Sequence, residues 1–311
     1  MIIPARPGEG SVPAVEAALR LDYPLDRLEI LLARGRQPSV QRNVAVREAS
    51  GDLIYFLDDD ALADVGNLRR AVEHFRDPSV WMVGGPNLCP QDAPELEQVF
   101  AVVLSTWLAF MSSRARYDAF GSVRRSGEKE LILCNLLSRR EPFLQQGGFD
   151  ESLYPNEENA LMDAFQKGGG ILLYDPDLSV QRRPRPSLRA FARMVFTYGR
   201  GRAEQFRLHP SLGSVPNFVP PVFCLYLLLL PWLGLLGLLP LAAYALLVAA
   251  QTLVSCRNKG VKRSLLAAPL ILLTHVGYGL GFWRGLFTRV RPPAAGGSIP
   301  VILQRIPHEK S

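Results

Sequence analysis

Three consecutive aspartates, Asp58, Asp59 and Asp60, follow the apolar run Leu53–Leu57, and their type and spacing suit them to chemistry. Adjacent carboxylates repel one another, so folding alone gives little reason to place three of them at the end of a buried strand. A divalent cation does give a reason, because Mg²⁺ and Mn²⁺ prefer carboxylate oxygens as ligands. The cluster therefore predicts a site for Mg²⁺ or Mn²⁺. The alternative is a solvated acidic turn that caps the next helix.

The elements that must position these carboxylates are indicated by short apolar runs that alternate with amphipathic stretches. This alternation is typical of an α/β domain in which helices cover both faces of a mainly parallel sheet. Such folds bind ligands outside the carboxyl ends of the strands, where we expect the aspartates to lie. We predict strands at 2–3, 28–32, 53–57, 80–83, 131–133 and 171–174, and helices at 12–21, 41–49, 67–75, 96–111 and 158–167.

The second half of the chain indicates a membrane protein. Of the 311 residues, 48% are hydrophobic, and the excess is concentrated in two uncharged stretches, 219–255 and 265–283. Stretches of this length can form membrane-spanning helices. We predict two or three hydrophobic segments at about 219–237, 239–256 and 265–287. Three full spans would place Arg289 and Arg291 outside, against the positive-inside tendency, so whether the third segment crosses is left open.

The net charge of +6 is explained by one segment. Residues 182–207 contain eight arginines and one acid, Glu204, so they contribute +7 and the rest of the chain sums to −1. A basic stretch before a hydrophobic one is typical of a segment that faces anionic lipid on the cytoplasmic side. We expect an amphipathic helix at 189–206 on the membrane surface. Nucleic acid is not an expected partner, because no nucleic-acid motif accompanies the charge.

The cysteines and the domain boundaries complete this outline. The four cysteines form no CxxC pair, which argues against a zinc site or a disulfide framework. No signal peptide is visible, so the first half is expected in the cytoplasm. We predict a cytoplasmic domain at 1–185, a basic interfacial linker at 186–215, a membrane region at 216–290 and a tail at 291–311.

The order of the motifs resembles a known family. After a helix containing Asn43 come Phe56-Leu57-Asp58-Asp59-Asp60-Ala61, then Gly147-Gly148-Phe149-Asp150, then Glu157-Glu158. This order resembles the inverting family 2 glycosyltransferases, which have a Rossmann-like GT-A fold. The segment from His275 to Phe282 resembles the membrane-anchored bacterial members that build exopolysaccharide of the succinoglycan type. The resemblance implies a GT-A domain followed by C-terminal transmembrane helices.

The resemblance assigns roles to the acidic residues. Asp58 and Asp60 match the family's Asp-x-Asp, whose metal ion neutralises the diphosphate leaving group. Asp59 is expected to contact the ribose or sugar hydroxyls of the donor. Glu158 matches the catalytic base, which takes a proton from the acceptor hydroxyl in a single, inverting displacement. The alternative for Glu157-Glu158 is an acidic helix start that complements the helix dipole.

The resemblance also implies binding residues, with departures. Pro4, Ala5 and Arg6 occupy the donor-binding first loop, although the usual Asn-Glu is absent. The family usually ends its second strand with an aspartate that pairs with the uracil ring, but Ala33 stands at that position. UDP-sugar is therefore favoured as the donor by the overall resemblance alone. Arg42 could hold donor phosphates, because guanidinium suits them, or lie in a solvated basic loop. Expected contacts to acceptor or phosphate come from four residues: Asn135, Glu157, Arg200 and Arg202. For Asn135 the alternative is a turn, and for the two arginines it is a lipid headgroup.

Together these features predict a metal-dependent, hexosyltransferase-type enzyme of the bacterial cytoplasmic membrane. It would be multi-pass, with its catalytic domain cytoplasmic, and would move a sugar from a nucleotide-sugar donor to a polyprenyl-linked acceptor in cell-surface polysaccharide biosynthesis. One alternative is a polyprenyl-phosphate sugar synthase, whose acceptor is already ionised and needs no base. Another is a degenerate glycosyltransferase-like subunit that assists assembly in the membrane without catalysis.

Overall fold

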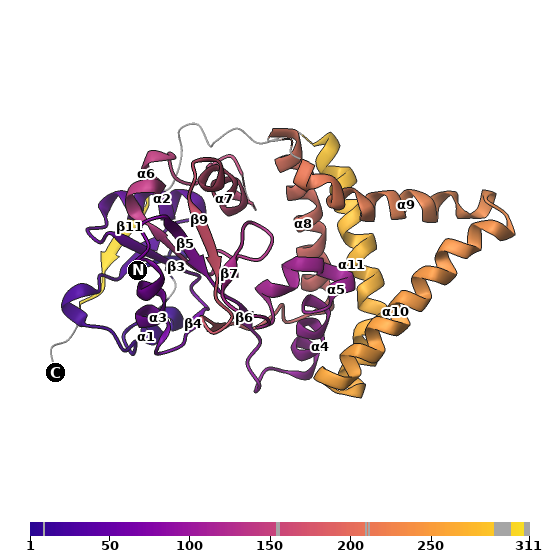
Figure 1. The fold of residues 1–311 in the computed structure, drawn as a ribbon, viewed down its shortest axis with the longest axis horizontal. Helices are drawn as coiled ribbons and strands as arrows, with labels where there is room; N and C mark the ends of the chain where they lie inside the picture. The colour runs from indigo at the N-terminus through magenta and orange to yellow at the C-terminus, as the bar shows by residue number, and fades with distance from the viewer. Residues whose placement is uncertain (9, 154–155, 209, 211, 289–299, 308–311) are drawn as a thin grey trace. The chain divides into compact units, whose positions relative to one another are not determined.

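The computed structural model describes the chain except residues 9, 154–155, 209, 211, 289–299 and 308–311 (Figure 1). The chain divides into two compact units. The sheet unit comprises residues 1–90, 115–182 and 292–311, and the helical unit comprises 91–114 and 183–291. Both units are discontinuous in sequence, in contrast to the contiguous ranges that the sequence predicts. Segment 91–114, for example, groups with the later helices instead of with the sheet.

The sheet unit is built on an eight-stranded sheet of order β11-β2-β1-β3-β8-β5-β9-β7. Parallel pairing joins β1 to β2, β1 to β3, and β5 to β9, whereas β8, β7 and β11 pair antiparallel. The sheet is therefore mixed, where we expected a mainly parallel one. Its strands are β1 (Ile2–Ala5), β2 (Leu31–Arg34), β3 (Leu53–Leu57), β5 (Val80–Gly84), β7 (Arg124–Arg125), β8 (Asn135–Arg139), β9 (Ile171–Tyr174) and β11 (Ile302–Arg305).

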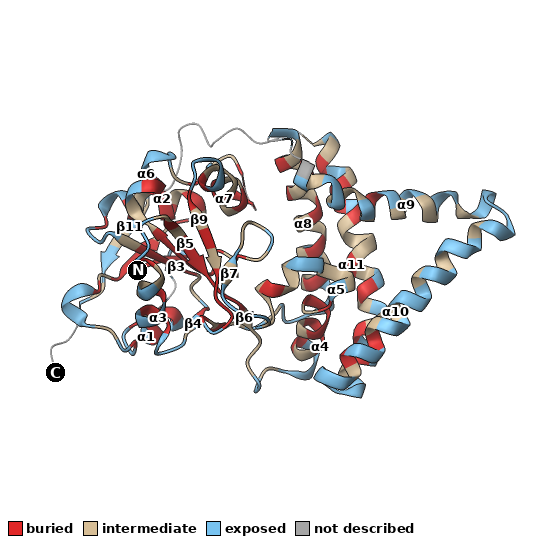
Figure 2. Ribbon diagram, in the orientation of Figure 1, coloured by how far each residue is buried: buried red, intermediate tan, exposed pale blue. Residues whose placement is uncertain are grey.

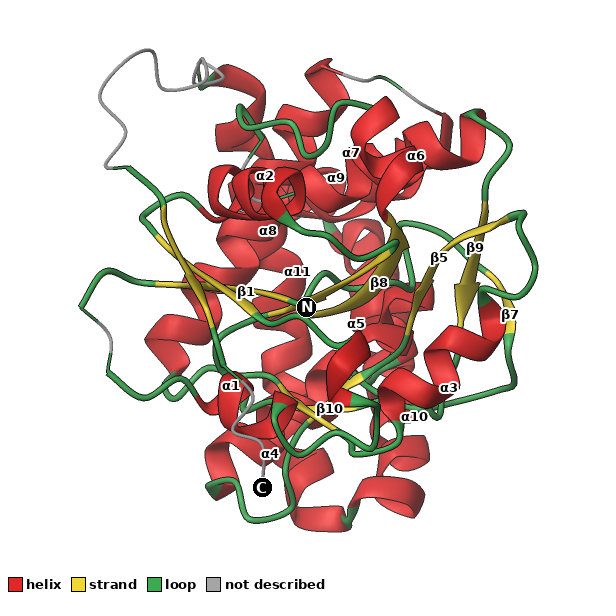
Figure 3. Cartoon of the chain, turned by 90° about the vertical axis from the view of Figure 1, so that its left-hand side faces the viewer, coloured by secondary structure: helices red, strands yellow, loops and turns green. Residues whose placement is uncertain are grey.

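Two hydrophobic cores cover the two faces of this sheet, because successive strand residues point to opposite sides. Ile3 belongs to one core with residues of α1 (Pro13–Ala18) and α3 (Asn67–His74). Ile2 belongs to the other core with residues of α2 (Pro38–Glu48), α6 (Arg140–Gln145) and α7 (Glu157–Lys167). Figure 3 shows these two sets of helices on opposite faces of the strands. This arrangement confirms the predicted α/β class.

A small second sheet of order β4-β10-β6 lies in the same unit. Its strands are β4 (Leu62–Ala63), β6 (Asn87–Leu88) and β10 (Val180–Gln181), and β10 pairs antiparallel with β4. This pairing matters for the site, because β4 closely follows the three aspartates and β10 directly precedes Arg182. Short 3₁₀ segments complete the unit and its connections: η1 (Leu25–Arg27) and η2 (Met111–Arg116).

Three sequence predictions of local structure are corrected here. The expected strand at 131–133 is a buried loop, and the strand β8 begins only at Asn135. The expected helix at 96–111 is broken. The first part ends at Leu104, and the Thr106 hydroxyl then accepts a hydrogen bond from the Ala109 N–H as the N-cap of the next helix. The expected tail at 291–311 contributes β11, which pairs with β2 from Ile302↔Arg34 to Arg305↔Leu31.

The helical unit contains α4 (Glu95–Leu104), α5 (Trp107–Phe110), α8 (Leu188–Leu208), α9 (Val219–Leu229), α10 (Leu238–Lys259) and α11 (Val261–Phe287), with 3₁₀ segments η3 (Leu212–Phe218), η4 (Leu230–Trp232) and η5 (Leu235–Gly237). Three stretches, Gly213–Trp232, Leu235–Lys259 and Val261–Phe287, are long and apolar enough to cross a membrane. Figure 2 shows α10 mostly exposed and α9 partly exposed, with few buried residues in either.

Candidate active site

The three aspartates lie at the carboxyl end of β3. The last four residues of this strand are buried, and the chain reaches the surface at Asp58, which is half-buried, and at Asp60, which is exposed. Ile2 of the parallel strand β1 pairs with Phe56, so Pro4 and Ala5 at the end of β1 reach the same edge of the sheet. The structure therefore brings the predicted donor-binding start of the chain to the aspartate cluster.

Arg42 links the aspartates to the acidic pair. Its side chain, on α2, is only 5% exposed, and its guanidinium contacts Asp58 Oδ1 at 2.7 Å and Glu157 Oε1 at 3.4 Å. These partners lie 16 and 115 residues from Arg42 along the chain. A buried arginine is stable only when its charge is paired and hydrogen-bonded. Arg42 thus holds carboxylates from two distant elements in one charge network.

Arg182 contacts both outer aspartates. It directly follows β10, and its Nη2 lies 3.2 Å from Asp58 Oδ2 while its Nε lies 2.5 Å from Asp60 Oδ1. Burial alone would lower the pKa of Arg182, but Asp58, followed by Cys134 and Asp60, raises it well above its usual range, so this side chain is a fixed positive charge. Sequence analysis counted Arg182 among the membrane-flanking arginines and missed this contact. Its position directly after a short strand was the available signal.

Glu157 and Glu158 begin α7 in different environments. The side chain of Glu157 is 3% exposed, and burial, followed by the charge of Glu158, raises its pKa from 4.5 to about 7. Glu158 is half-buried and so reaches the surface. The preceding residue, Asn156, has a φ of 105°, a backbone conformation that is rare outside glycine. Backbone strain of this kind is often found at functional sites, and here it lies at the start of the acidic helix.

Asn135 has a packing role in this structure. It is fully buried at the start of β8, where its Oδ1 accepts a hydrogen bond from the Tyr55 hydroxyl at 2.7 Å. Its Nδ2 donates to Leu178 O at 2.6 Å, so both ends of the amide bind within the fold. The expected contact of Asn135 with acceptor or phosphate stays a prediction.

The remaining predicted residues divide between the units. Asp59 is half-buried and its backbone oxygen accepts a hydrogen bond from the Ala14 N–H. Arg6 is exposed after β1, and its backbone oxygen accepts from Arg34. Arg200 and Arg202 belong to α8 in the helical unit, where Arg200 pairs with Glu204 at 3.4 Å. The role of these two arginines at phosphate therefore stays a prediction.

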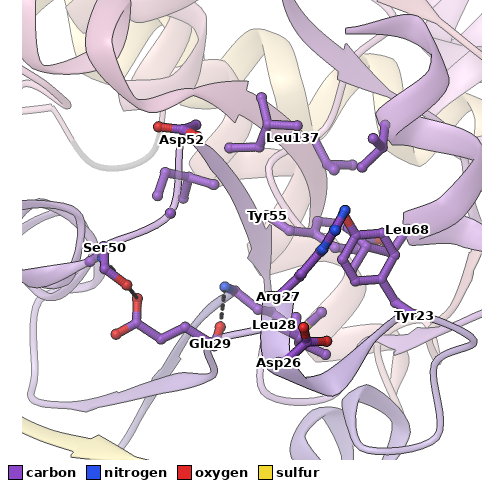
Figure 4. A pocket seen from close by; sticks show the side chains of 16 residues that line it. Tyr23, Asp26, Arg27, Leu28, Glu29, Ser50, Asp52, Tyr55, Leu68 and Leu137 are labelled. Atoms are coloured by element: carbon purple, nitrogen blue, oxygen red, sulfur yellow. Dashed lines mark hydrogen bonds between the residues drawn. The ribbon is translucent and has the colours of Figure 1, made fainter. Parts of the chain in front are cut away.

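A cavity of about 450 Å³ lies at the opposite, amino ends of the strands (Figure 4). Its lining includes Met1 before β1, Glu29 before β2 and Asp52 before β3. Glu29 accepts a hydrogen bond from the Ser50 hydroxyl at 3.1 Å, so part of its polar surface is already satisfied. The predicted site residues do not line this cavity.

The carboxylates at the carboxyl edge of the sheet fit a divalent cation that is bound together with substrate phosphates. Within the described residues, no group of three or more His, Cys, Asp or Glu side chains is arranged to hold a metal ion. Mg²⁺, however, is commonly bound by one or two carboxylates together with substrate phosphates and water. Asp58 and Asp60 supply two such carboxylates, both already engaged by a cation, Arg182. The edge therefore suits a metal that arrives with a phosphate-bearing ligand.

Comparisons with known proteins find similar glycosyltransferases and polysaccharide-biosynthesis proteins. Residues 14–123 match the model of glycosyl transferase family 2. The succinoglycan biosynthesis protein ExoA of Rhizobium meliloti (strain 1021) is 25% identical over 92% of this chain and 94% of its own length. The pre-mycofactocin glycosyltransferase of Mycobacterium tuberculosis (strain CDC 1551 / Oshkosh) is 25% identical over 56% of this chain and 36% of its own length.

A solved structure supports the fold. The mannosyltransferase PcManGT from Pyrobaculum calidifontis, determined in complex with GDP-Man and Mn²⁺, superimposes with a TM-score of 0.52 at 19% identity. The superposition covers 86% of this chain and 85% of PcManGT. At this identity the likeness concerns the fold. The structure therefore shows a GT-A-like fold, and residues 14–123 are similar to glycosyl transferase family 2.

Proposed function

We propose that this chain is a metal-dependent, inverting, membrane-anchored glycosyltransferase on the cytoplasmic face of a bacterial inner membrane. It moves a sugar, of hexose type, from a nucleotide-sugar donor to a lipid-linked acceptor in the assembly of a surface polysaccharide. The observation that carries this proposal is the network in which Arg42 joins Asp58 to Glu157 at the start of α7. A degenerate fold would have little reason to keep charged groups buried together, because each costs free energy unless it is paired.

The names of the similar proteins support the substrates. ExoA is named for succinoglycan biosynthesis, and PcManGT was determined with GDP-Man and Mn²⁺ bound. A nucleotide-sugar donor and a divalent metal follow by analogy. The membrane part is supported by the three apolar stretches of the helical unit. Because a polyprenyl-linked acceptor resides in the bilayer, an anchored enzyme meets it without diffusing through water.

The donor end of the reaction belongs to the aspartates and their arginines. A bound Mg²⁺ or Mn²⁺, held by Asp58 and Asp60, would neutralise the negative charge of the departing nucleoside diphosphate. Arg182 already lies between these carboxylates, so it must release at least one of them when a cation binds. The freed guanidinium can then donate hydrogen bonds to phosphate oxygens, for which its planar fork is well suited.

The acceptor end belongs to the start of α7. Glu158 reaches the surface there, and we assign it the role of base that removes the proton of the acceptor hydroxyl. Glu157 stays buried beneath it, and its pKa of about 7 means that its charge changes near neutral pH. Glu157 positions the turn by its contact with Arg42 instead of reacting. A single base of this kind leads to one displacement and so to inversion.

The nucleotide base is the least constrained part of the donor. Ala33, at the position where the family has its uracil aspartate, is fully buried and pairs with Leu303 of β11. A small apolar residue offers no carboxylate to a uracil ring. UDP-sugar, which sequence analysis favoured, is therefore one member of a panel that includes GDP-, dTDP- and CMP-sugars.

The test is metal-dependent binding of this panel to the purified protein, measured by calorimetry with and without Mn²⁺. We expect one donor class to bind only with Mn²⁺, and the Asp60→Ala variant to lose that binding. Asp64→Ala is the matched control, because Asp64 lies near the cluster but accepts its hydrogen bond from the Gly66 N–H. Absence of binding across the panel would reject the donor model and favour a non-catalytic membrane subunit.

A further inference from the structure

The eight-stranded sheet contains strands from both sides of the long helical segment. β9 precedes α8, and β11 follows α11, yet both belong to the same sheet. β11 pairs with β2 over four residues, from Ile302↔Arg34 to Arg305↔Leu31. An open sheet cannot stand in hydrocarbon, because its unpaired backbone groups would lose their hydrogen bonds to water. β9 and β11 therefore lie on the same side of the membrane.

This shared sheet restricts the number of membrane crossings to an even one. Between β9 and β11 lie three stretches that could cross, Gly213–Trp232, Leu235–Lys259 and Val261–Phe287. The remaining sequence from 288 to 301 contains Arg289, Arg291 and three prolines, and it is shorter than the ~20 apolar residues that a span needs. It cannot supply a fourth crossing. At least one of the three stretches therefore does not cross.

The same rule applies to the bent pair formed by α4 and the helical turns after it. That pair, Glu95–Leu104 with Trp107–Arg116, passes a length and composition test for one broken span. It lies between β6 and β7, which both belong to the sheet unit. A single span between them would place parts of one unit on opposite sides of the bilayer. The pair therefore does not cross.

Packing identifies α11 as the long helix that stays on one side. One third of its most apolar 18-residue window is buried inside the protein, compared with 6% for each of the other two candidates. It packs backbone to backbone on α8, because a Cβ added at Gly281 or Gly285 would overlap the carbonyl groups of Phe196 or Arg200. A helix in such contact shares the environment of its partner.

That partner, α8, is a charged helix. It carries five arginines, Arg189, Arg193, Arg200, Arg202 and Arg207, and they cannot all be accommodated in hydrocarbon. An amphipathic helix rich in arginine lies in the headgroup region instead. Because α11 packs directly on α8, we place α11 in the headgroup region too. This placement of α8 agrees with the amphipathic surface helix that its sequence predicts.

Polar contacts at both ends of α11 agree with this placement. At its start, Arg263 pairs with Glu95 of α4 at 3.0 Å, and Lys262 approaches the same carboxylate at 3.8 Å. At its end, Arg207 of α8 donates a hydrogen bond to the Gly285 oxygen at 3.1 Å. A crossing helix would have its two ends in water on opposite sides, whereas these ends contact α4 and α8, two helices that do not cross.

The hairpin of α9 and α10 differs from α11 in burial, because only 6% of the most apolar window of each of its two stretches is buried. From 219 to 255 it has no charged residue, and its connecting turn exposes Trp232 and Leu235 to 76% and 83%. We propose that α9 and α10 enter the bilayer together as one hairpin, while α11 lies in the interface beside α8, so that β11 stays on the catalytic side. This proposal rests on the membrane anchoring proposed above and specifies the surface that meets lipid acyl chains.

Three single cysteines test the proposal. Glu73→Cys on α3 marks the sheet unit, Lys262→Cys marks the start of α11, and Gln304→Cys marks β11; all three side chains are exposed. Each variant is labelled with a membrane-impermeant maleimide in intact spheroplasts and in inverted vesicles of expressing bacteria. The chain with only its native cysteines gives the background. We expect all three to react in inverted vesicles and to be protected in spheroplasts.

Labelling of Gln304→Cys in intact spheroplasts, with Glu73→Cys protected, would overturn the proposal, because α11 would then cross. Labelling of Lys262→Cys there would also overturn it, because another helix would then be the one that does not cross. Should the cysteine at 304 fail to react on either side, fusions after Ser311 decide: a fluorescent-protein fusion that fluoresces supports the proposal, and an active alkaline-phosphatase fusion rejects it.

Membrane fractionation separates this result from the broader proposal. A chain that carbonate removes from the membranes would overturn both the anchoring and the hairpin. A chain that stays in the membranes but labels from outside at 304 overturns the hairpin arrangement alone. Neither readout depends on sugar transfer, so the arrangement can be tested before the donor is known.

Discussion

The sheet unit and the helical unit depart from the usual distribution of side chains in opposite ways. The sheet unit buries charge: Arg42 and Glu157 are buried and Arg182 is half-buried, all near the ends of strands. The helical unit exposes apolar side chains, with Trp232, Leu235 and Leu246 all more than 70% exposed. Lone exposed leucines are ordinary, but buried charges and large apolar surfaces are the informative exceptions.

The difference indicates what each unit contacts. Buried charges cost free energy unless they are paired, and they are kept where a charged ligand or a reaction needs them. A continuous apolar surface costs free energy in water and none in lipid. This contrast is what we expect if, as proposed, the first unit binds a charged substrate and the second meets a membrane. The following variants test this contrast, beginning with the largest expected effect.

Glu158→Gln should reduce transfer to a hydroxyl acceptor by about 10²–10⁴-fold, because it removes the general base. Donor binding should stay unchanged, since the donor contacts belong to the aspartate edge. The measurement is kcat for transfer together with the dissociation constant of the donor. Glu141→Gln on α6 is the control, because Glu141 is exposed and pairs with Gln145 away from the site.

If Glu158→Gln retained most of its activity, the assignment of the base would be wrong. Retained activity with an ionised polyprenyl phosphate as acceptor would support the sugar-synthase alternative, because such an acceptor needs no base. The same variant therefore distinguishes the two enzyme hypotheses that the sequence left open.

Leu246→Lys should cost about 3 kcal/mol of stability in lipid, because a lysine near the middle of a spanning helix must leave hydrocarbon or deform the bilayer. Leu19→Lys is the matched control: Leu19 is also exposed, but it lies in the sheet unit, where a surface substitution costs about 0.5 kcal/mol or less. Thermal unfolding in lipid nanodiscs measures both. Equal, small effects would show that α10 is not surrounded by lipid.

Local patterns explain what could be predicted from the sequence. An apolar run followed by three aspartates predicted β3 and the carboxylates at its end, and acidic residues before an amphipathic stretch predicted the start of α7. Both predictions depend only on neighbouring residues. The amphipathic helix after Arg182 was found in the same way, because its charge and periodicity are visible within twenty residues.

Contacts between distant residues could not be predicted in this way. Arg182 and Asp60 lie 122 residues apart, and β11 pairs with β2 across most of the chain. The raised pKa of Glu157 depends on burial beneath residues from other elements. β8 was misplaced because Leu131 and Leu133 are buried in a loop and imitate a strand. In each case tertiary packing, and not local preference, decides the outcome.

Arg182→Gln should bind Mn²⁺ about tenfold more tightly than the native chain when no donor is present. The reason is that removing a guanidinium from between Asp58 and Asp60 removes a competing cation, and a charge-assisted hydrogen bond is worth ~1.5–3 kcal/mol. Arg183→Gln is the control, because this neighbouring arginine pairs with Glu97 in the helical unit. Paramagnetic resonance of free Mn²⁺ measures the affinity. Unchanged or weaker binding by Arg182→Gln would contradict a shared site.

Glu157→Gln should change the pH dependence of stability by a few degrees in Tm. The pKa of Glu157 is raised to about 7 in the folded chain, chiefly by burial, from about 4.5 when unfolded. Between these values the folded state binds more protons, so the native chain loses stability as pH rises from about 4.5 to about 7. Glutamine does not titrate, so the variant should gain Tm relative to the native chain over this range, by roughly 2–4 °C for each kcal/mol that the native chain loses. Glu141→Gln should show no such gain. If Glu157→Gln showed no gain either, Glu157 would be charged and stably paired at both ends of this pH range. Burying the charge of Glu157 would then cost the sheet unit no free energy near neutral pH.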